Sequence, residues 1–251
     1  MNLSDAQLDR YARHIVLREI GGEGQKKLLG AHVALIGAGG IGSPALQYLA
    51  GAGVGTISVI DDDVVELSNL QRQTLYPVSK IGMPKAEAAC RFAEALNPDL
   101  ALIPVVERLT AENAERILAG ADVILDGCDN FGTRLIVSDA SLGLHTPLVS
   151  AAVAQFEGQI GIYRGWEAGQ PCYRCLVGSD PGFPDQSCAD QGVLGAMAGV
   201  VGSLAALEAL RIIAPFGEDR RGSLLRLDGL TMGFRMARIG KDPECPACSK
   251  A

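Results

Sequence analysis

The sequence predicts an α/β fold built on a doubly wound, mostly parallel sheet. Short apolar or β-branched runs alternate with segments of helical length between His32 and Val153. A glycine-rich turn separates the first of these runs from the helix expected after it. A strand, a helix and a second strand in that order imply a right-handed parallel crossover.

The expected elements follow from local signals along the chain. Ser4 is a plausible N-cap for a helix over 6–27, which Gly21 and Gly22 are expected to break into two pieces. Pro84 occupies a favourable position at the start of a helix over 85–96. The expected strands are 32–36, 56–60, 101–106, 122–125 and 148–153, with 159–163 as an antiparallel addition, and the other expected helices are 43–52, 112–119 and 133–144.

Beyond residue 164 this alternation fails. Residues 165–191 are loop-like, and a loop of that length is uncommon unless it is functional or disordered. An apolar helix over 193–214 and two last strands over 223–228 and 231–239 are expected to follow. We therefore expect a single domain over 1–251, with a Rossmann-like part at 1–164 and a loop, long helix and C-terminal antiparallel extension at 165–251.

Composition and charge exclude several classes of protein. The 251 residues are 48% hydrophobic and 20% charged, and the net charge is −7 without a long basic run. These values argue against nucleic acid or an anionic membrane as the main partner. The uncharged stretch Val193–Leu207 is too short to span a bilayer as a helix, and Met1–Arg10 lacks the apolar core of a signal peptide. We expect a buried helix and a cytoplasmic location.

The glycine turn predicts a nucleotide site in the 1–164 part. Residues Gly37–Gly42 match G-x-G-x-x-G between an expected strand and an expected helix, and glycines let backbone N–H groups approach a phosphate closely. Asp61 ends the next expected strand, where a carboxylate can accept hydrogen bonds from ribose hydroxyls. The motif suits NAD, FAD or a mononucleotide. An NAD-dependent oxidoreductase therefore stays open, although no His–Asp pair for hydride chemistry stands out.

Charged residues farther along the chain suit a triphosphate. Arg72 and Lys85 could neutralise the two anions that meet when a carboxylate attacks a triphosphate, or they could be solvated surface charges. Asp129 lies just beyond an expected strand, where ligands of open α/β sheets gather, and its oxygens suit Mg²⁺. Asp126 is equally well explained as a strand-end cap or turn residue.

The seven cysteines predict a metal site. An odd count argues against a disulfide framework. Two C-x-x-C pairs, which could close a tetrahedral structural zinc site or act as redox pairs, are formed by Cys172, Cys175, Cys245 and Cys248. Cys188 precedes the long helix and is either a nucleophile with a lowered pKa or a bystander. Cys90 and Cys128 are expected to be packing residues.

Three segments resemble the ThiF/MoeB family, the bacterial relatives of the ubiquitin-activating enzyme. They are the glycine turn, Ser68-Asn69-Leu70-Gln71-Arg72-Gln73 and Asp126-Gly127-Cys128-Asp129-Asn130. The resemblance spans nearly the whole chain, and the family's usual D-C-T-D-N differs here only in its middle two residues. It implies a dimeric Rossmann-like enzyme that uses Mg²⁺ and ATP to adenylate a ubiquitin-like sulfur carrier protein ending in Gly-Gly.

The resemblance also implies roles for individual residues. Arg72, Lys85 and Asp129 would be catalytic, with Asp129 acting through magnesium, and Arg13 would reach the nucleotide of the neighbouring subunit. Cys188 matches a cysteine that ThiF-type proteins link to the sulfur carrier. The implied nucleotide-binding residues are Gly37, Gly39, Gly40, Gly42, Asp61, Ser68, Asn69, Gln71, Arg72, Lys85, Asp129 and Asn130.

The expected partner is a carrier of the molybdopterin-synthase type, with the sulfur carrier of thiamine biosynthesis as the close alternative. A carboxylate is already ionised near neutral pH, so the reaction needs no strong general base. Catalysis would consist mostly of positioning and charge neutralisation. An NAD-dependent oxidoreductase and a zinc-stabilised scaffold remain as alternatives from other classes.

Overall fold

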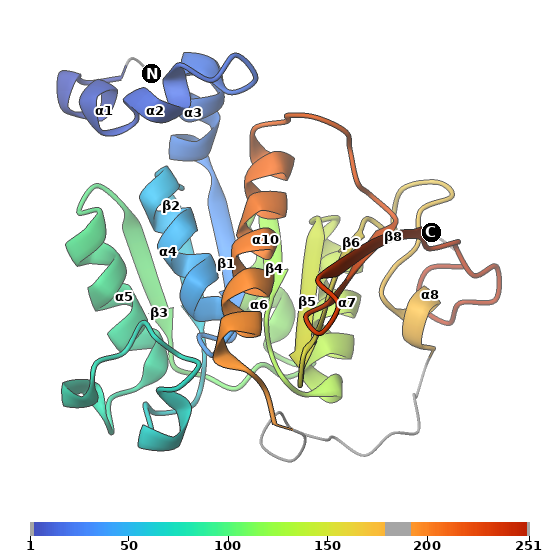
Figure 1. Ribbon diagram of the computed structural model, residues 1–251. Coiled ribbons are helices and arrows are strands. Elements are labelled where there is room, and N and C mark those ends of the chain that lie inside the picture. Colours follow the sequence, from blue (N-terminus) through green and yellow to red (C-terminus); the bar gives the residue numbers. More distant parts are fainter. Residues whose placement is uncertain (1–2, 179–191, 250–251) are drawn as a thin grey trace.

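One eight-stranded sheet organises the computed structural model, which describes residues 3–178 and 192–249. The strands run in the order β3-β2-β1-β4-β5-β6-β7-β8, with β1 to β5 parallel and β6 to β8 antiparallel (Figure 1). Their bounds are β1 His32–Ile36, β2 Thr56–Ile60, β3 Ala101–Val105, β4 Val123–Asp126, β5 Leu148–Ala154, β6 Glu157–Tyr163, β7 Ser223–Asp228 and β8 Gly233–Arg238. This arrangement confirms the predicted α/β class and its antiparallel extension.

Helices cover both faces of the sheet. They are α1 Asp5–Arg10, α2 Ala12–Ile15, α3 Gly21–Gly30, α4 Gly42–Ala52, α5 Lys85–Leu96, α6 Ala114–Leu118, α7 Phe131–Leu144, α8 Arg174–Val177 and α10 Gly195–Ile213. Alternate residues of the central strands enter two separate cores, one with α4, α5 and α10 and the other with α6 and α7. A strand buried on both faces needs a nearly continuous apolar run, and β1 and β4 have one.

Outside the N-terminal segment, the predicted elements match the structure to within two residues at each end. The N-terminal helix is interrupted at 16–20, and Gly21 and Gly22 begin α3 instead of breaking it. The last strand starts at Gly233, two residues later than expected, because the carboxylate of Asp228 accepts hydrogen bonds from the N–H groups of Leu230 and Thr231 and closes a turn there.

The apolar helix α10 is a core helix, as predicted. Among the described residues it is the helix long and apolar enough to cross a membrane, yet it packs on α4 and on β4, β5 and β6 (Figure 1). Gly195 lets the start of α10 lie against the backbone of Gln71, because a Cβ there would lie 2.2 Å from the carbonyl oxygen of that residue.

Candidate functional site

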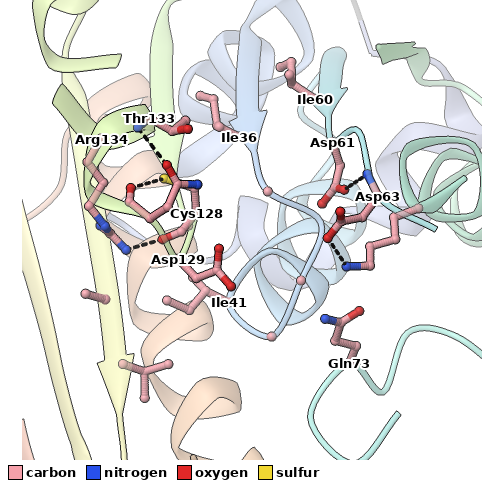
Figure 2. A pocket seen from close by; sticks show the side chains of 18 of the residues that line it. Ile36, Ile41, Ile60, Asp61, Asp63, Gln73, Cys128, Asp129, Thr133 and Arg134 are labelled. Carbon is pink, nitrogen blue, oxygen red and sulfur yellow. Dashed lines mark hydrogen bonds and ion pairs between the residues drawn. The ribbon is translucent and has the colours of Figure 1, made fainter. Parts of the chain in front are cut away.

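A cavity of about 580 Å³ opens where β1, β2, β4 and β5 end, between the glycine turn, the segment 61–73 and the loop after β4 (Figure 2). Ligands of open α/β sheets bind at this edge, because the strand order reverses there and the loops diverge. Of the residues expected to bind nucleotide, those lining the cavity are Gly37, Gly39, Gly40, Asp61, Asn69, Arg72, Lys85, Asp129 and Asn130.

The glycine turn has the tight geometry that its sequence predicts. Gly37 has φ +82°, and a Cβ at Gly42 would lie 1.9 Å from the carbonyl oxygen of Gly37, so both positions require glycine. Gly42 therefore shapes the turn without lining the cavity. Beneath the turn, the hydroxyl of Tyr76 donates to the carbonyl of Ala38 at 2.7 Å. Helix α4 begins at Gly42, so its N-terminus faces the cavity.

Asp61 stands at the end of β2 beside this turn. Its Oδ2 accepts from the N–H of Ala38 at 2.7 Å, and its Oδ1 accepts from the N–H of Asp63 at 2.9 Å. Burial raises the pKa of Asp61 above its usual value, and the nearby Lys85 ammonium opposes that rise only in part. Each oxygen keeps a free lone pair, so the carboxylate can still accept from two hydroxyl groups.

Lys85 and Arg72 both line the cavity, and neither is a freely solvated surface charge. The Lys85 side chain is 5% exposed, and its Nζ lies 2.8 Å from Oδ2 of Asp63. The half-buried Arg72 donates from Nη1 to the carbonyl of Ser68 at 3.3 Å. Two cations thus stand at one wall of a cavity whose floor is a glycine turn, an arrangement suited to a polyphosphate.

The loop after β4 brings a carboxylate to the opposite wall. Asp129 is exposed and lines the cavity, and within the described parts of the chain its carboxylate makes no hydrogen bond or ion pair. Asn130 is the N-cap of α7, because its Oδ1 accepts from the N–H of Thr133 at 2.8 Å. Asp126 is the last residue of β4, and its Oδ1 accepts from the N–H of Cys128 at 3.0 Å as a strand-end cap.

Gln73 and Arg134 are among the cavity residues that the sequence prediction did not assign. Gln73 is buried; its Nε2 donates to Oδ1 of Asn69 at 2.7 Å, while its Oε1 has no hydrogen-bond partner. Arg134 is buried beneath the Asp129 loop and forms an ion pair with Asp126. Gln73 stood in the quoted motif, but nothing in a single sequence indicates that a polar side chain is buried at the wall of a cavity.

Besides Gly42, four predicted residues lie away from the cavity or outside the described residues. Ser68 and Gln71 sit on the segment that carries Arg72 but do not line the cavity. Arg13 is exposed on α2, beyond the amino ends of the strands (Figure 1). Because a five-residue strand is roughly 16 Å long, β1 separates Arg13 from the cavity of its own chain. Cys188 lies outside the described residues.

Cys90 and Cys128 have the properties of packing residues, as predicted. Burial raises the pKa of the Cys90 thiol to about 11, and burial followed by the charge of Asp126 raises that of Cys128. Both thiols therefore stay protonated near neutral pH, which fits packing residues.

The four cysteines of the two C-x-x-C pairs meet beside α8. Their sulfur atoms all lie within 4.8 Å of one another, and three of the separations are 3.4, 3.6 and 3.9 Å. Tetrahedral zinc with Zn–S bonds of about 2.3 Å needs sulfur atoms about 3.8 Å apart, so the cluster fits zinc. Between the first pair, Arg174 forms a bidentate ion pair with Asp139 of α7, at 2.7 Å for each bond.

Comparison with known proteins shows which family and which proteins this chain is similar to. The model of the ThiF family matches residues 11–247. The chain is 44% identical to the sulfur carrier protein adenylyltransferase of Thermus thermophilus, covering 99% of this chain and 93% of that protein. It is 42% identical to the sulfur carrier protein ThiS adenylyltransferase of Escherichia coli, covering 98% and 97%. A crystal structure of E. coli MccB shares the fold, with a TM-score of 0.84 at 22% identity over 98% of this chain and 74% of that one.

Proposed function

The chain belongs to the ThiF family, and from this we propose that it is an adenylyltransferase that uses ATP to adenylate the C-terminal glycine carboxylate of a ubiquitin-like sulfur carrier protein. The observation that carries the proposal is the convergence of the glycine turn, Asp61, Lys85 and Asp129 on one cavity. The relatives named above are adenylyltransferases of sulfur carrier proteins. This favours nucleotidyl transfer over the oxidoreductase chemistry that the glycine turn also allowed.

The cavity has a place for each part of ATP. Apolar side chains of Ile36, Ile60 and Leu109 line it and can pack against the adenine. The carboxylate of Asp61 accepts hydrogen bonds from the ribose hydroxyls, while the glycine turn and the N-terminus of α4 face the phosphates. Lys85 then lies where the phosphate chain passes.

The reaction needs little from the protein beyond positioning. A carboxylate oxygen of the carrier attacks the α-phosphorus in line, the bond from that phosphorus to the bridging oxygen breaks, and its electron pair leaves with pyrophosphate. Arg72 and Lys85 neutralise charge that would otherwise repel the incoming carboxylate. The free carboxylate of Asp129 fits magnesium, which when bound would neutralise phosphate charge. The four cysteines would hold a structural zinc, which would tie α8 to the C-terminal segment.

An exposed apolar strip beside the cavity suits the body of the carrier. The strip consists of Leu230, Met232, Phe234 and Met236 of the β7–β8 hairpin, which are 74, 74, 55 and 48% exposed. The hairpin is joined to the strand that ends at the cavity, because the N–H of Gly229 donates to the carbonyl of Phe156, two residues beyond the cavity-lining Ala154. A carrier seated on this strip can reach the cavity with a flexible Gly-Gly tail.

We assign Arg13 to the cavity of a second copy of the chain. Its position beyond the amino ends of the strands separates it from its own cavity, while the exposed guanidinium can reach across a homodimer interface. There it would stabilise charge on the transferring phosphoryl group.

The test is ATP–pyrophosphate exchange with purified carriers. The carrier of molybdopterin synthase is expected to support exchange, and the same carrier without its terminal glycine is the matched control. Exchange only with the carrier of thiamine biosynthesis would redirect the assignment to that pathway. No exchange with either carrier would refute the proposed function.

The apolar strip has its own test. Met232→Glu should raise the carrier concentration needed for half-maximal exchange without changing ATP affinity.

A further inference from the structure

The buried ion pair of Asp126 and Arg134 lies directly beneath the loop that carries Asp129. Their side chains are 1% and 8% exposed. Arg134 donates from Nη1 to Oδ2 of Asp126 at 3.4 Å and to Oγ of Ser150 at 3.1 Å, and Ser150 donates to the same Oδ2 at 2.9 Å. Asp126 and Ser150 face each other in the register of β4 and β5, which brings the three groups together.

This pair binds both the backbone N–H and the backbone carbonyl of Cys128. Oδ1 of Asp126 accepts from the N–H of Cys128 at 3.0 Å. Nη2 of Arg134 donates to the carbonyl of the same residue (Figure 2). Nη2 also donates to the carbonyl of Ala151 at 2.9 Å, so the guanidinium connects the loop to β5. The residue before Asp129 is therefore tied to the sheet at its nitrogen and at its oxygen.

The residue after Asp129 is also held, since Asn130 caps α7. Asp129 thus stands between two anchored neighbours, while its own carboxylate is exposed and makes no hydrogen bond or ion pair within residues 3–178 and 192–249. A buried ion pair is often no more stabilising than an apolar pair of the same volume. A fold that needed only packing at this place would not require two buried charges.

Building on the proposed function, we propose that Asp126 and Arg134 are positioning residues that hold Asp129 for a divalent cation bound with the nucleotide. Asp129 is the oxygen ligand, and the pair acts through it without touching the metal. Burial lowers the pKa of Arg134, but the neighbouring acidic groups, first among them Asp126, together raise it by more. The guanidinium therefore stays charged, with its four hydrogen bonds intact, over the whole working pH range.

The test replaces both charges together. Asp126→Asn with Arg134→Met leaves no unpaired buried charge and keeps an oxygen for the N–H of Cys128, but it removes the guanidinium from the loop. Mn²⁺ affinity is measured by electron paramagnetic resonance in the presence of a non-hydrolysable ATP analogue, so no carrier is needed. Loss of an outer positioning residue weakens metal affinity about 10- to 100-fold, and we expect a weakening in that range.

A matched control and a double-mutant cycle separate positioning from general destabilisation. The control is Glu208→Gln with Arg211→Met, which removes another buried pair, 3.0 Å apart, outside the cavity. It should lower the melting temperature without changing Mn²⁺ affinity. In the Asp129→Ala background, loss of the pair should weaken Mn²⁺ binding no further, because the pair acts only through Asp129.

Two results would overturn the proposal: unchanged Mn²⁺ affinity in the folded pair variant, or additive losses with Asp129→Ala. If the pair variant does not fold, Arg134→Lys replaces it. That variant keeps the charge beside Asp126 but loses the guanidinium fork, so the same weakening and the same non-additivity are expected. Because the titration contains no carrier, it can fail or succeed independently of pyrophosphate exchange.

Discussion

Replacing Lys85 by methionine should separate nucleotide binding from stability. The ion partner of Lys85, Asp63, is 70% exposed, so the pair contributes less than about 1 kcal/mol to folding. The Lys85 side chain itself is 5% exposed, so its contact with a phosphate is shielded from water. A hydrogen bond to a charged group at such a place contributes about 2–3 kcal/mol, which corresponds to a roughly 30- to 150-fold weaker affinity for ATP.

The assay is calorimetric titration of ATP into the protein, with thermal unfolding measured in parallel. Lys85→Met should weaken ATP binding within that range while the melting temperature falls by less than about 4 °C, the shift that about 1 kcal/mol produces in a chain of this size. Lys26→Met is the matched control, because Lys26 also pairs with a carboxylate, Glu23 at 2.7 Å, but lies on α3 away from the cavity. ATP affinity within twofold of the unmodified protein would refute the placement of the phosphates beside Lys85.

Three further predictions concern the subunit arrangement, the metal and pH. The Arg13→Ala and Asp129→Ala variants should each be inactive alone, but mixing them should recover about a quarter of the activity. Half of random dimers are mixed, and each mixed dimer has one intact cavity. No recovery would argue that Arg13 acts in its own chain. Cys245→Ser should abolish zinc binding, as shown by metal analysis, and lower the melting temperature by roughly 8–16 °C, since loss of a metal ligand can cost about 4 kcal/mol. ATP affinity should fall as the pH drops through the raised pKa of Asp61, because only the ionised carboxylate has both oxygens free to accept from ribose, and Asp61→Asn should remove that dependence.

The raised pKa of Asp61 also has a consequence for stability without nucleotide. The folded chain binds this proton more tightly than the unfolded chain does, so through this group stability is greatest at acidic pH and is lost as the pH rises through the folded pKa. The ionised carboxylate is therefore held at a cost that the rest of the fold offsets. This combination is expected at a binding site and is not expected of a residue kept for packing alone.

The sequence by itself determined the elements whose signals are local. Strands β1, β2 and β7 begin and end at the predicted residues, because each is a short apolar or β-branched run closed by glycines or aspartates. The glycine turn was equally readable, since a positive φ at Gly37 and the close approach at Gly42 leave no room for a side chain. Such constraints involve neighbours in the chain, and one sequence contains all of them.

Only the tertiary structure decided which distant residues meet. Cys172 and Cys245 are 73 positions apart, and their sulfur atoms come within 3.6 Å because α8 and the C-terminal segment fold together. The burial of Gln73 and of Arg134, and the removal of Arg13 to the far end of the strands, are likewise set by the packing of the sheet. A polar side chain has the same letter whether it faces water, a ligand or a buried carboxylate, and the difference lies in surroundings that the fold alone supplies.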